Sequence, residues 1–321
     1  MGIVRLAIDV VGGDYGPGVV IRGAVEAKLR SGLNFSPLLC GKREQIEHII
    51  KSLESSQRVI AEEFDIEHCP EIISGSDTPA RAWKTKKNSS IVRCVALQKE
   101  GKVNASISAG DTGTLLGAAV FLLGRSESVA RPALAAFLPT IRKRPSLMLD
   151  VGANLDCRVE HLVTFGLMGF EYYQKFFAIK TPQVFLLNIG KEPFKGTRTL
   201  HEADRLLRDR CRGYRGFIEG SRVLSGDADI IVCDGFAGNV LLKACESFHG
   251  LVAKALGDEN GLFEAVKQKM AVLNSENYGA VPLLGIKGIV MKAHGSSSST
   301  AIARAIETSV MLVRKNGSSQ K

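Results

Sequence analysis

Five short apolar stretches of this chain each end in a glycine-rich turn that carries polar side chains. Asp, Asn, Ser and Thr dominate these turns, and such side chains can bind polar or anionic substrates together with the backbone N–H groups of the loops. Buried parallel strands bring loops of this kind to the carboxyl edge of a sheet, where open α/β sheets bind ligands. The pattern therefore predicts an active site built from the segments 6–17, 106–113, 147–156, 186–196 and 230–239.

Two predicted helix starts offer backbone N–H groups to an anion. Thr112 and Gly113 follow a strand and open an apolar helix, so their N–H groups lack an intrahelical acceptor. An equally good interpretation is that the Asp111 side chain caps this helix and takes up the same donors. The start at segment 294–297 is the better phosphate site, because it is rich in hydroxyl groups and follows Lys292.

Three side chains are candidates for catalysis. His294 ends a predicted strand and opens a glycine turn, where it could act as a general acid or base, although a lone histidine is more often structural. Lys195 lies in a glycine-bounded loop, where its ammonium group could bind phosphate, polarise a carbonyl group or simply stay solvated. Cys157 is better explained as a core thiol than as a nucleophile, because no histidine lies beside it in the sequence.

No metal and no nucleotide cofactor is expected. HxxxH and HExxH spacings are absent, and no histidine stands next to an Asp or Cys at ligand spacing. The first turn, at 12–17, lacks the G-x-G-x-x-G spacing of dinucleotide-binding loops. The predicted chemistry therefore depends on the side chains and backbone groups of the chain itself.

The net charge of +9 indicates a negatively charged partner. Nucleic acid, an anionic lipid surface and an acidic protein or phosphate-bearing substrate all fit this charge, as does a basic surface that only maintains solubility. Nucleic acid is the weakest of these interpretations, because one Trp and five Tyr offer few stacking rings and no nucleic-acid motif is present.

Composition indicates a globular protein of the cytoplasm. The 321 residues are 45% hydrophobic, which is enough to bury a large core. Neither a signal peptide nor an apolar run of the roughly 18 residues needed to cross a bilayer is found. The seven cysteines form no CxxC pair and lie mostly in apolar surroundings, as expected in a reducing compartment.

The elements that position the loops alternate between strand and helix, which predicts an α/β fold with a parallel sheet. Residues 239–277 show only helical patterning, which favours either packing on the sheet or an arm that pairs with a second subunit. Nothing separates independent domains, so residues 1–321 are expected to form a single domain with two lobes around a cleft. Strands are expected near 4–9, 36–40, 103–108, 184–188, 229–233 and 288–294, and helices over 19–29, 46–54, from Ser89 onward, and 299–314.

Eight motifs occur in order along almost the whole chain: IDVVGGDYGP, KKNSSI, SAGDTGTLLGAA, RPALAAFLPT, LDVGANLDC, LLNIGKEPFKG, VCDGFAGNVLLK and KAHGSS. Together they resemble the phosphate acyltransferases of bacterial phospholipid synthesis. The resemblance implies transfer of a fatty acyl group from acyl carrier protein to inorganic phosphate, giving acyl phosphate for glycerol-3-phosphate acylation.

The same resemblance implies an architecture and partners. The fold would be Rossmann-like, with a largely parallel sheet, helices on both faces and a helical arm, similar to isocitrate and isopropylmalate dehydrogenases. A homodimer is implied, together with peripheral association with the membrane and contact with a membrane glycerol-3-phosphate acyltransferase. The acidity of acyl carrier protein would account for the basic charge of this chain, because complementary fields speed encounter.

On this assignment, candidate roles follow for residues that lie in the motifs. Lys195 is assigned to polarising the thioester carbonyl, Asn239 to orienting phosphate, and His294 to the catalytic set. Asp111 stands where the family usually has Asn, and a carboxylate there would repel phosphate. The substrate-binding residues implied are Asp9, Gly12, Gly13, Asp14, Lys87, Ser89, Ser108, Asp111, Thr112, Gly113, Asp150, Asn154, Asn188, Asp234 and Ser296.

Two alternatives remain beside this assignment. A short-chain phosphotransacylase that uses acyl-coenzyme A would share the same fold and a similar phosphate site. A non-catalytic scaffold that recruits acyl carrier protein to membranes would share the basic surface. The helical segment 239–277 looks shorter than in many relatives, which weakens the case for membrane contact through its tip.

Overall fold

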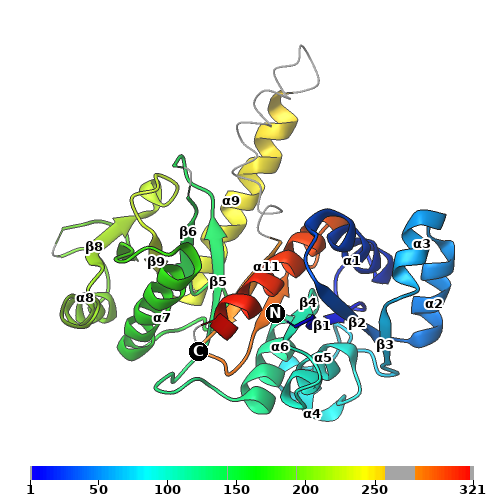
Figure 1. The fold of residues 1–321 in the computed structure, drawn as a ribbon. Helices are drawn as coiled ribbons and strands as arrows, with labels where there is room; N and C mark the ends of the chain where they lie inside the picture. Colours follow the sequence, from blue (N-terminus) through cyan, green and yellow to red (C-terminus); the bar gives the residue numbers. More distant parts are fainter. Residues whose placement is uncertain (1, 143, 193, 257–278, 319–321) are drawn as a thin grey trace. The chain divides into compact units, whose positions relative to one another are not determined.

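The computed structural model describes residues 2–142, 144–192, 194–256 and 279–318 (Figure 1). The chain divides into two compact units. Unit 1 comprises residues 1–127 and 278–321, and unit 2 comprises residues 128–277. The carboxyl-terminal segment thus returns to the unit that the amino-terminal segment begins.

Unit 1 is built on a sheet whose strands run in the order β3-β2-β1-β4-β11-β10. Its first five strands are parallel to their neighbours, and β10 is antiparallel to β11. Strand β1 is buried at five of its six positions, as expected for a central parallel strand. The strands are β1 (Val4–Asp9), β2 (Phe35–Gly41), β3 (Asp65–His68), β4 (Ala105–Ser108), β10 (Ala280–Leu284) and β11 (Val290–Ala293).

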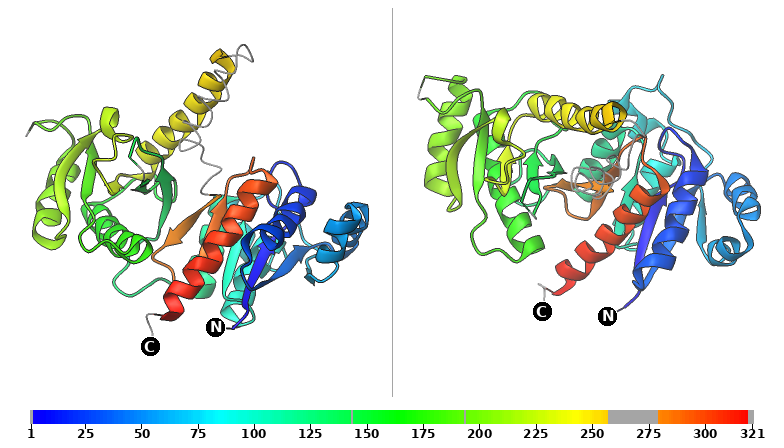
Figure 2. Two further views of the ribbon diagram at one scale, coloured as in Figure 1. Left: turned by 45° about the horizontal axis from the view of Figure 1, so that its top comes forward. Right: turned by 90° about the horizontal axis from the view of Figure 1, so that it is seen from above.

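Helices cover both faces of the unit 1 sheet. Helices α1 and α11 lie side by side on one face, where the Thr300 hydroxyl bonds Glu26, and α5 packs on the other (Figure 2). Right-handed crossovers explain this division, because the chain leaves β1 toward β2 but crosses back past β1 to reach β4. The helices are α1 (Pro17–Ser31), α2 (Arg43–Ser52), α3 (Ser55–Ala61), α4 (Pro79–Thr85), α5 (Ser90–Lys99), α6 (Thr112–Ala118), the π-helical turn η1 (Ala119–Leu123) and α11 (Ser299–Ser318).

Within unit 2 the strands run in the order β5-β6-β9-β7-β8. Strands β6, β9, β7 and β8 are parallel, and β5 is antiparallel to β6. The strands are β5 (Ala133–Leu138), β6 (Ser146–Leu149), β7 (Val184–Asn188), β8 (Tyr214–Glu219) and β9 (Ile230–Val232). The helices are α7 (Val159–Phe177), α8 (Arg198–Arg210), the 3-10 turn η2 (Gly220–Arg222) and α9 (Gly235–Leu256).

The predicted α/β fold, with a largely parallel sheet and helices on both faces, is confirmed. The expected strands at 4–9, 36–40 and 184–188 agree closely with β1, β2 and β7. The antiparallel pairs β10–β11 and β5–β6 fall outside the expected alternation, because a short connection reverses the chain in each pair.

The predicted helical arm is partly described. Helix α9 runs to Leu256 and extends well beyond the sheet of unit 2 (Figure 1). The remainder of the segment 239–277 lies outside the described residues. Of the helices that are described, none is both long and apolar enough to span a bilayer.

Candidate active site

A pocket of about 600 Å³ lies at the carboxyl edge of the unit 1 sheet. It is bounded by the turns that follow β1, β4 and β11, by the loop before α4, and by the first residues of α5. Two of the five predicted loop segments, 6–17 and 106–113, thus lie at one edge of this sheet. The predicted residues that line the pocket are Asp9, Gly12, Gly13, Asp14, Ser89, Asp111 and Thr112.

The Asp9 carboxylate holds the first turn through hydrogen bonds. Its Oδ1 accepts hydrogen bonds from the N–H groups of Val11 and Gly12, at 3.1 and 3.2 Å. Its Oδ2 accepts from the Ser108 hydroxyl at 2.6 Å, and Ser108 Oγ in turn accepts from the N–H of Gly110 at 3.0 Å. Asp9 and Ser108 are almost fully buried. Their side chains thus join the β1 and β4 turns, and Asp9 also lines the pocket.

Glycine is required where these two turns meet. A Cβ on Gly12 would lie only 2.4 Å from the backbone nitrogen of Gly110. No side chain fits in that space, so the backbones approach directly and the pocket wall at this point consists of peptide groups. Close packing of the two backbones therefore explains why glycine occurs here, without any bound nucleotide.

The turn after β11 joins the same site. The N–H of Asp14 donates to the carbonyl oxygen of Gly295 at 2.7 Å, which ties the first turn to the last. His294 is exposed, and its Nδ1 accepts from the Ser296 N–H at 3.2 Å and lies 2.7 Å from the Ser296 hydroxyl. An Nδ1 that accepts from an N–H group leaves the proton of the neutral imidazole on Nε2. His294 and Ser296 lie beside the pocket residue Gly295 but are not themselves part of the lining.

Most carboxylates of the pocket are already committed to hydrogen bonds. Asp111 caps α6 by accepting from the Thr114 N–H at 2.7 Å, so the capping interpretation of this turn is confirmed. Lys86 bonds Asp77 and, as the main cause, lowers the pKa of that carboxyl group to about 2. Lys292, half-buried, adds a positive charge to the lining. Lys87 is exposed, lies after α4 and does not line the pocket.

Unit 2 repeats the arrangement of a buried aspartate at the end of a strand. Asp150 follows β6, and its Oδ1 accepts from the N–H groups of Leu134 and Ala153 at 2.9 and 3.1 Å. Its Oδ2 accepts from both the backbone N–H and the side-chain amide of Asn154, at 2.6 and 2.9 Å. Burial is the largest influence on Asp150 and raises its pKa. Asp150 and Asn154 therefore build the turn of the LDVGANLD motif instead of pointing outward.

The loop after β7 presents Lys195. The Asn188 side chain ends this strand, and its Nδ2 donates to the Lys195 carbonyl oxygen at 2.9 Å. Its Oδ1 accepts from the Ile189 N–H at 2.9 Å. Asn188 is 5% exposed, whereas Lys195 is half-buried, so a fixed backbone carries a side chain that reaches solvent.

The turn after β9 begins helix α9. Asp234 caps this helix, because its Oδ1 accepts from the Ala237 N–H at 2.8 Å. Asn239, one turn later, is exposed and donates from Nδ2 to the Val151 carbonyl oxygen at 3.1 Å. The contact joins the turns after β6 and β9. Asp150, Asn188, Asp234 and Asn239 thus come together at the carboxyl edge of the unit 2 sheet, as the sequence predicts for their strands.

Exposed apolar side chains surround this edge of unit 2, and the motifs did not single them out. Ile189 and Phe194 belong to the Lys195 loop and are 77% and 78% exposed. Leu155 follows Asn154, and Phe236 and Val240 flank Asn239 on α9. In the sequence, these side chains could have been recognised because large apolar residues are unusual inside polar, glycine-rich loops. Such a rim is suited to an apolar substrate chain or a protein surface.

The Cys157 thiol, close to these turns, is not activated. Burial, the largest influence, raises the pKa of the Cys157 thiol to about 12, and the nearby Asp150 and Asp234 add to the effect. The interpretation of Cys157 as a core thiol agrees with this environment. Within the described part of the chain, no cluster of three or more His, Cys, Asp or Glu side chains is arranged to hold a metal ion.

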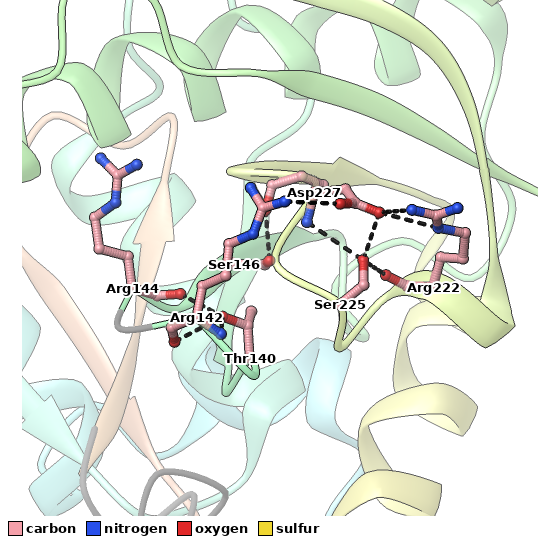
Figure 3. A network of polar contacts seen from close by, with 8 residues as sticks. Thr140, Arg142, Arg144, Ser146, Arg222, Ser225 and Asp227 are labelled. Carbon is pink, nitrogen blue, oxygen red and sulfur yellow. Dashed lines mark hydrogen bonds and ion pairs between the residues drawn. The ribbon is translucent and has the colours of Figure 1, made fainter.

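A basic cluster near the loop between β5 and β6 is held by ion pairs and hydrogen bonds within unit 2 (Figure 3). Arg142 and Arg222 both pair with Asp227, the former at 3.2 Å. The Ser225 hydroxyl donates to the same carboxylate at 2.7 Å and, with Arg222, lowers the pKa of Asp227. The Thr140 hydroxyl holds the loop by donating to the carbonyl oxygen of Arg142 at 3.0 Å. These arginines therefore serve the local structure.

Solved structures define the class of fold. The chain is similar to a phosphotransacetylase from Streptococcus pyogenes, with a TM-score of 0.65 and 16% identity over 97% of this chain and 94% of that one. It is also similar to 4-hydroxythreonine-4-phosphate dehydrogenase from Klebsiella pneumoniae, with a TM-score of 0.57 and 16% identity over 97% of both chains. At this identity the likeness concerns the fold, which is the α/β fold that these enzymes share.

Sequence relatives identify the family. The family model described as "Fatty acid synthesis protein" matches residues 4–320. A phosphate acyltransferase from Dictyoglomus turgidum is 37% identical over an alignment 326 positions long, which covers 97% of this chain and 94% of that protein. The chain belongs to this family of phosphate acyltransferases, and it is an acyltransferase of lipid biosynthesis.

Proposed function

We propose that this enzyme transfers a fatty acyl group from acyl carrier protein to inorganic phosphate. The acyl phosphate formed would serve glycerol-3-phosphate acylation in phospholipid synthesis. The observation that carries the proposal is membership of the phosphate acyltransferase family over nearly the full chain. A cytoplasmic homodimer that meets the membrane peripherally fits this role, because its product would be consumed by a membrane acyltransferase.

The reaction requires little activation of either substrate. A phosphate oxygen attacks the thioester carbonyl carbon, a C–O bond forms, and the C–S bond then breaks to release the carrier as a thiol. Near neutral pH phosphate is largely deprotonated, so no strong base is needed. The enzyme must place two reactants together and stabilise the oxyanion of the tetrahedral intermediate.

Lys195 is the proposed source of that stabilisation. Lys195 is a half-buried residue on a loop whose backbone Asn188 holds in place. A preorganised positive charge lowers the barrier because it need not be oriented during the reaction. Asn239, exposed one turn into α9, is proposed to orient phosphate. The exposed apolar side chains Ile189 and Phe194 on the Lys195 loop suit a fatty acyl chain.

The unit 1 pocket is proposed to bind the polar part of a substrate. Lys292, Ser89 and the peptide N–H groups of its lining are the proposed contacts. The carboxylates of Asp9, Asp77 and Asp111 in the same lining are held by hydrogen bonds. His294 is proposed to donate a hydrogen bond or a proton from Nε2 to the departing thiolate. This assignment follows from the Nδ1 acceptor contact with the Ser296 N–H.

One assay tests the proposal against both alternatives. The purified chain is incubated with phosphate and either acyl carrier protein thioester or acyl-coenzyme A, and acyl phosphate is trapped with hydroxylamine as the hydroxamate. We expect faster formation from the carrier-protein thioester. Preference for a short-chain coenzyme A thioester would indicate a phosphotransacylase, and no product from either donor would indicate a scaffold.

A further inference from the structure

An exposed aromatic pair lies beside the unit 1 pocket. The rings of Trp83, on α4, and Phe121, in η1, stack with centroids 4.2 Å apart and planes inclined by 13°. Phe121 is 61% exposed and Trp83 is half-buried. Large aromatic side chains that form a contiguous exposed surface are typical of protein interaction sites.

Helix α6 holds the Trp83 ring of this pair in position. A Cβ on Gly117 of α6 would lie 2.6 Å from Cδ1 of Trp83, so the indole rests directly on the helix backbone. Substitution at Gly117 would displace the ring. The aromatic surface is therefore rigid before any partner arrives, which reduces the entropy cost of binding.

Lys84 gives the aromatic surface a positive charge. Its Nζ lies 5.1 Å from the ring centroid of Trp83 and 5.6 Å from that of Phe121. Both distances fall within the range of cation–π attraction. The lysine is exposed, so its ammonium group lies over the rings and still faces solvent.

Two further cations extend the same charged surface. Arg81 lies on α4 and Lys87 follows it, and both are exposed. Among the described residues, neither these two side chains nor Lys84 forms an ion pair with a carboxylate. Lys86 differs, because it pairs with Asp77 at 2.6 Å. Three cations of this segment thus remain available to an acidic partner.

The aromatic surface is continuous with the pocket. Pro79, the first residue of α4, lines the pocket, and so does Ser89, which precedes α5. Trp83 follows Pro79 by about one turn, or roughly 6 Å along an α-helix. A partner bound over Trp83 therefore needs only a short arm to place a reactive group in the pocket.

We propose that Trp83, Phe121, Lys84 and Arg81 form the surface on which acyl carrier protein docks. The inference rests on the proposed function, which makes this carrier the donor. Carboxylates of the acidic carrier pair with the cations, its apolar side chains cover the stacked rings, and its acyl-bearing arm enters the pocket at Pro79. A second copy of this chain is disfavoured as the occupant, because it would bring the same positive charges.

Trp83 is the only tryptophan in the chain, so its fluorescence reports on this surface directly. Titration with a tryptophan-free acyl carrier protein should shift the Trp83 emission and protect the indole from quenching by acrylamide. The substitutions Lys84→Glu and Phe121→Asp should each raise the KM for the carrier-protein thioester by about tenfold, with kcat little changed.

A matched control separates local from general charge effects. Lys99→Glu makes the same charge reversal at an exposed residue of unit 1, nine residues from the start of α5 and thus roughly 13 Å along that helix. This variant should keep the wild-type KM. Equal effects of Lys99→Glu and Lys84→Glu would reduce the proposal to nonspecific electrostatics and overturn it.

Other outcomes would also overturn the docking site. One is that the carrier binds without changing the Trp83 emission or its quenching by acrylamide. The other is that Trp83 responds to anionic phosphatidylglycerol vesicles but not to carrier protein. If the wild-type chain makes no acyl phosphate from the carrier thioester, the proposed function fails instead. The fluorescence titration still decides docking in that case, because it requires no turnover.

Discussion

The Asn188 side-chain amide donates a hydrogen bond to the backbone carbonyl oxygen of Lys195, with 2.9 Å between Nδ2 and O. Asn188 ends strand β7 and is 5% exposed, and its Oδ1 also accepts from the Ile189 N–H. One buried amide therefore closes both ends of the loop that carries the proposed catalytic lysine. Asn188 was predicted as a substrate-binding residue; in this structure it bonds the backbone of the Lys195 loop, and we propose that it positions Lys195.

Substitution of Asn188 should reduce turnover by loosening this loop. Asn188→Ala leaves the Lys195 carbonyl and the Ile189 N–H without their partner, at a cost of about 1–3 kcal/mol in the free energy of unfolding. We expect kcat for acyl-phosphate formation to fall by about tenfold or more, with a smaller change in the KM for phosphate. Steady-state kinetics and thermal unfolding measure the two effects.

A double-mutant cycle tests whether Asn188 acts through Lys195. If it does, Asn188→Ala should add little to the loss already caused by Lys195→Ala, because the positioned group is gone. Additive losses would assign Asn188 a separate role in binding substrate. The conservative change Asn188→Asp keeps an acceptor for Ile189 but places a carboxylate against the Lys195 carbonyl, so it should not restore activity.

Lys195→Ala should lower acyl-phosphate formation by at least about tenfold without unfolding the protein. The lysine ammonium group would stabilise charge mainly in the transition state, so its loss should appear in kcat. Lys191→Ala, at an exposed lysine of the same loop, is the control and should stay close to wild type. Unchanged turnover of Lys195→Ala at saturating phosphate would remove Lys195 from the mechanism.

Association with acyl carrier protein should weaken steeply as salt rises. The chain carries a net charge of +9, and the screening length falls from about 30 Å at 0.01 M to about 3 Å at 1 M ionic strength. Surface plasmon resonance across this range should show mainly a slower association rate at high salt. A constant rate would show that charge does not guide the encounter.

The Cys157 thiol should react slowly with alkylating reagents. Burial raises its pKa to about 12, above the ordinary thiol value, so the reactive thiolate is scarce at pH 8 and becomes abundant only as pH approaches 12. We expect alkylation by iodoacetamide at pH 8 to be about a thousandfold slower than for a free cysteine, and fast once the chain is denatured. Cys157→Ser should keep acyl transfer within about twofold of wild type.

The protein should be a homodimer joined partly through the helical segment 239–277. On the described part of this segment, Val240 and Leu251 are 55% and 64% exposed. Burying such side chains contributes roughly 1.5–3 kcal/mol each, and an isologous interface is the commonest way to cover them. Light scattering at micromolar concentration should show a dimer for wild type and a monomer for Leu251→Asp. Lys243→Ala on the same helix should remain dimeric.

Local sequence pattern determined much of the fold. The buried strands β1, β2 and β7 appear in the sequence as short apolar runs, and each run ends in a loop at the predicted edge of its sheet. Glycine and the polar residues beside it marked these turns, because only a few residue types suit their backbone conformations. The ordered set of motifs also indicated the family, and the family model and the relatives show the same family over almost the whole chain.

The tertiary structure alone decided what the polar side chains of these loops do. Asp9 bonds Ser108, Asp150 bonds the N–H of Leu134, and Asn188 bonds the far end of its own loop. Trp83 meets Phe121 only because α4 packs against α6, which continues into η1. A residue's type and spacing define which hydrogen bonds or contacts it is able to make. Which of them forms depends on partners distant in the sequence, and on burial, which penalises every polar group left without one.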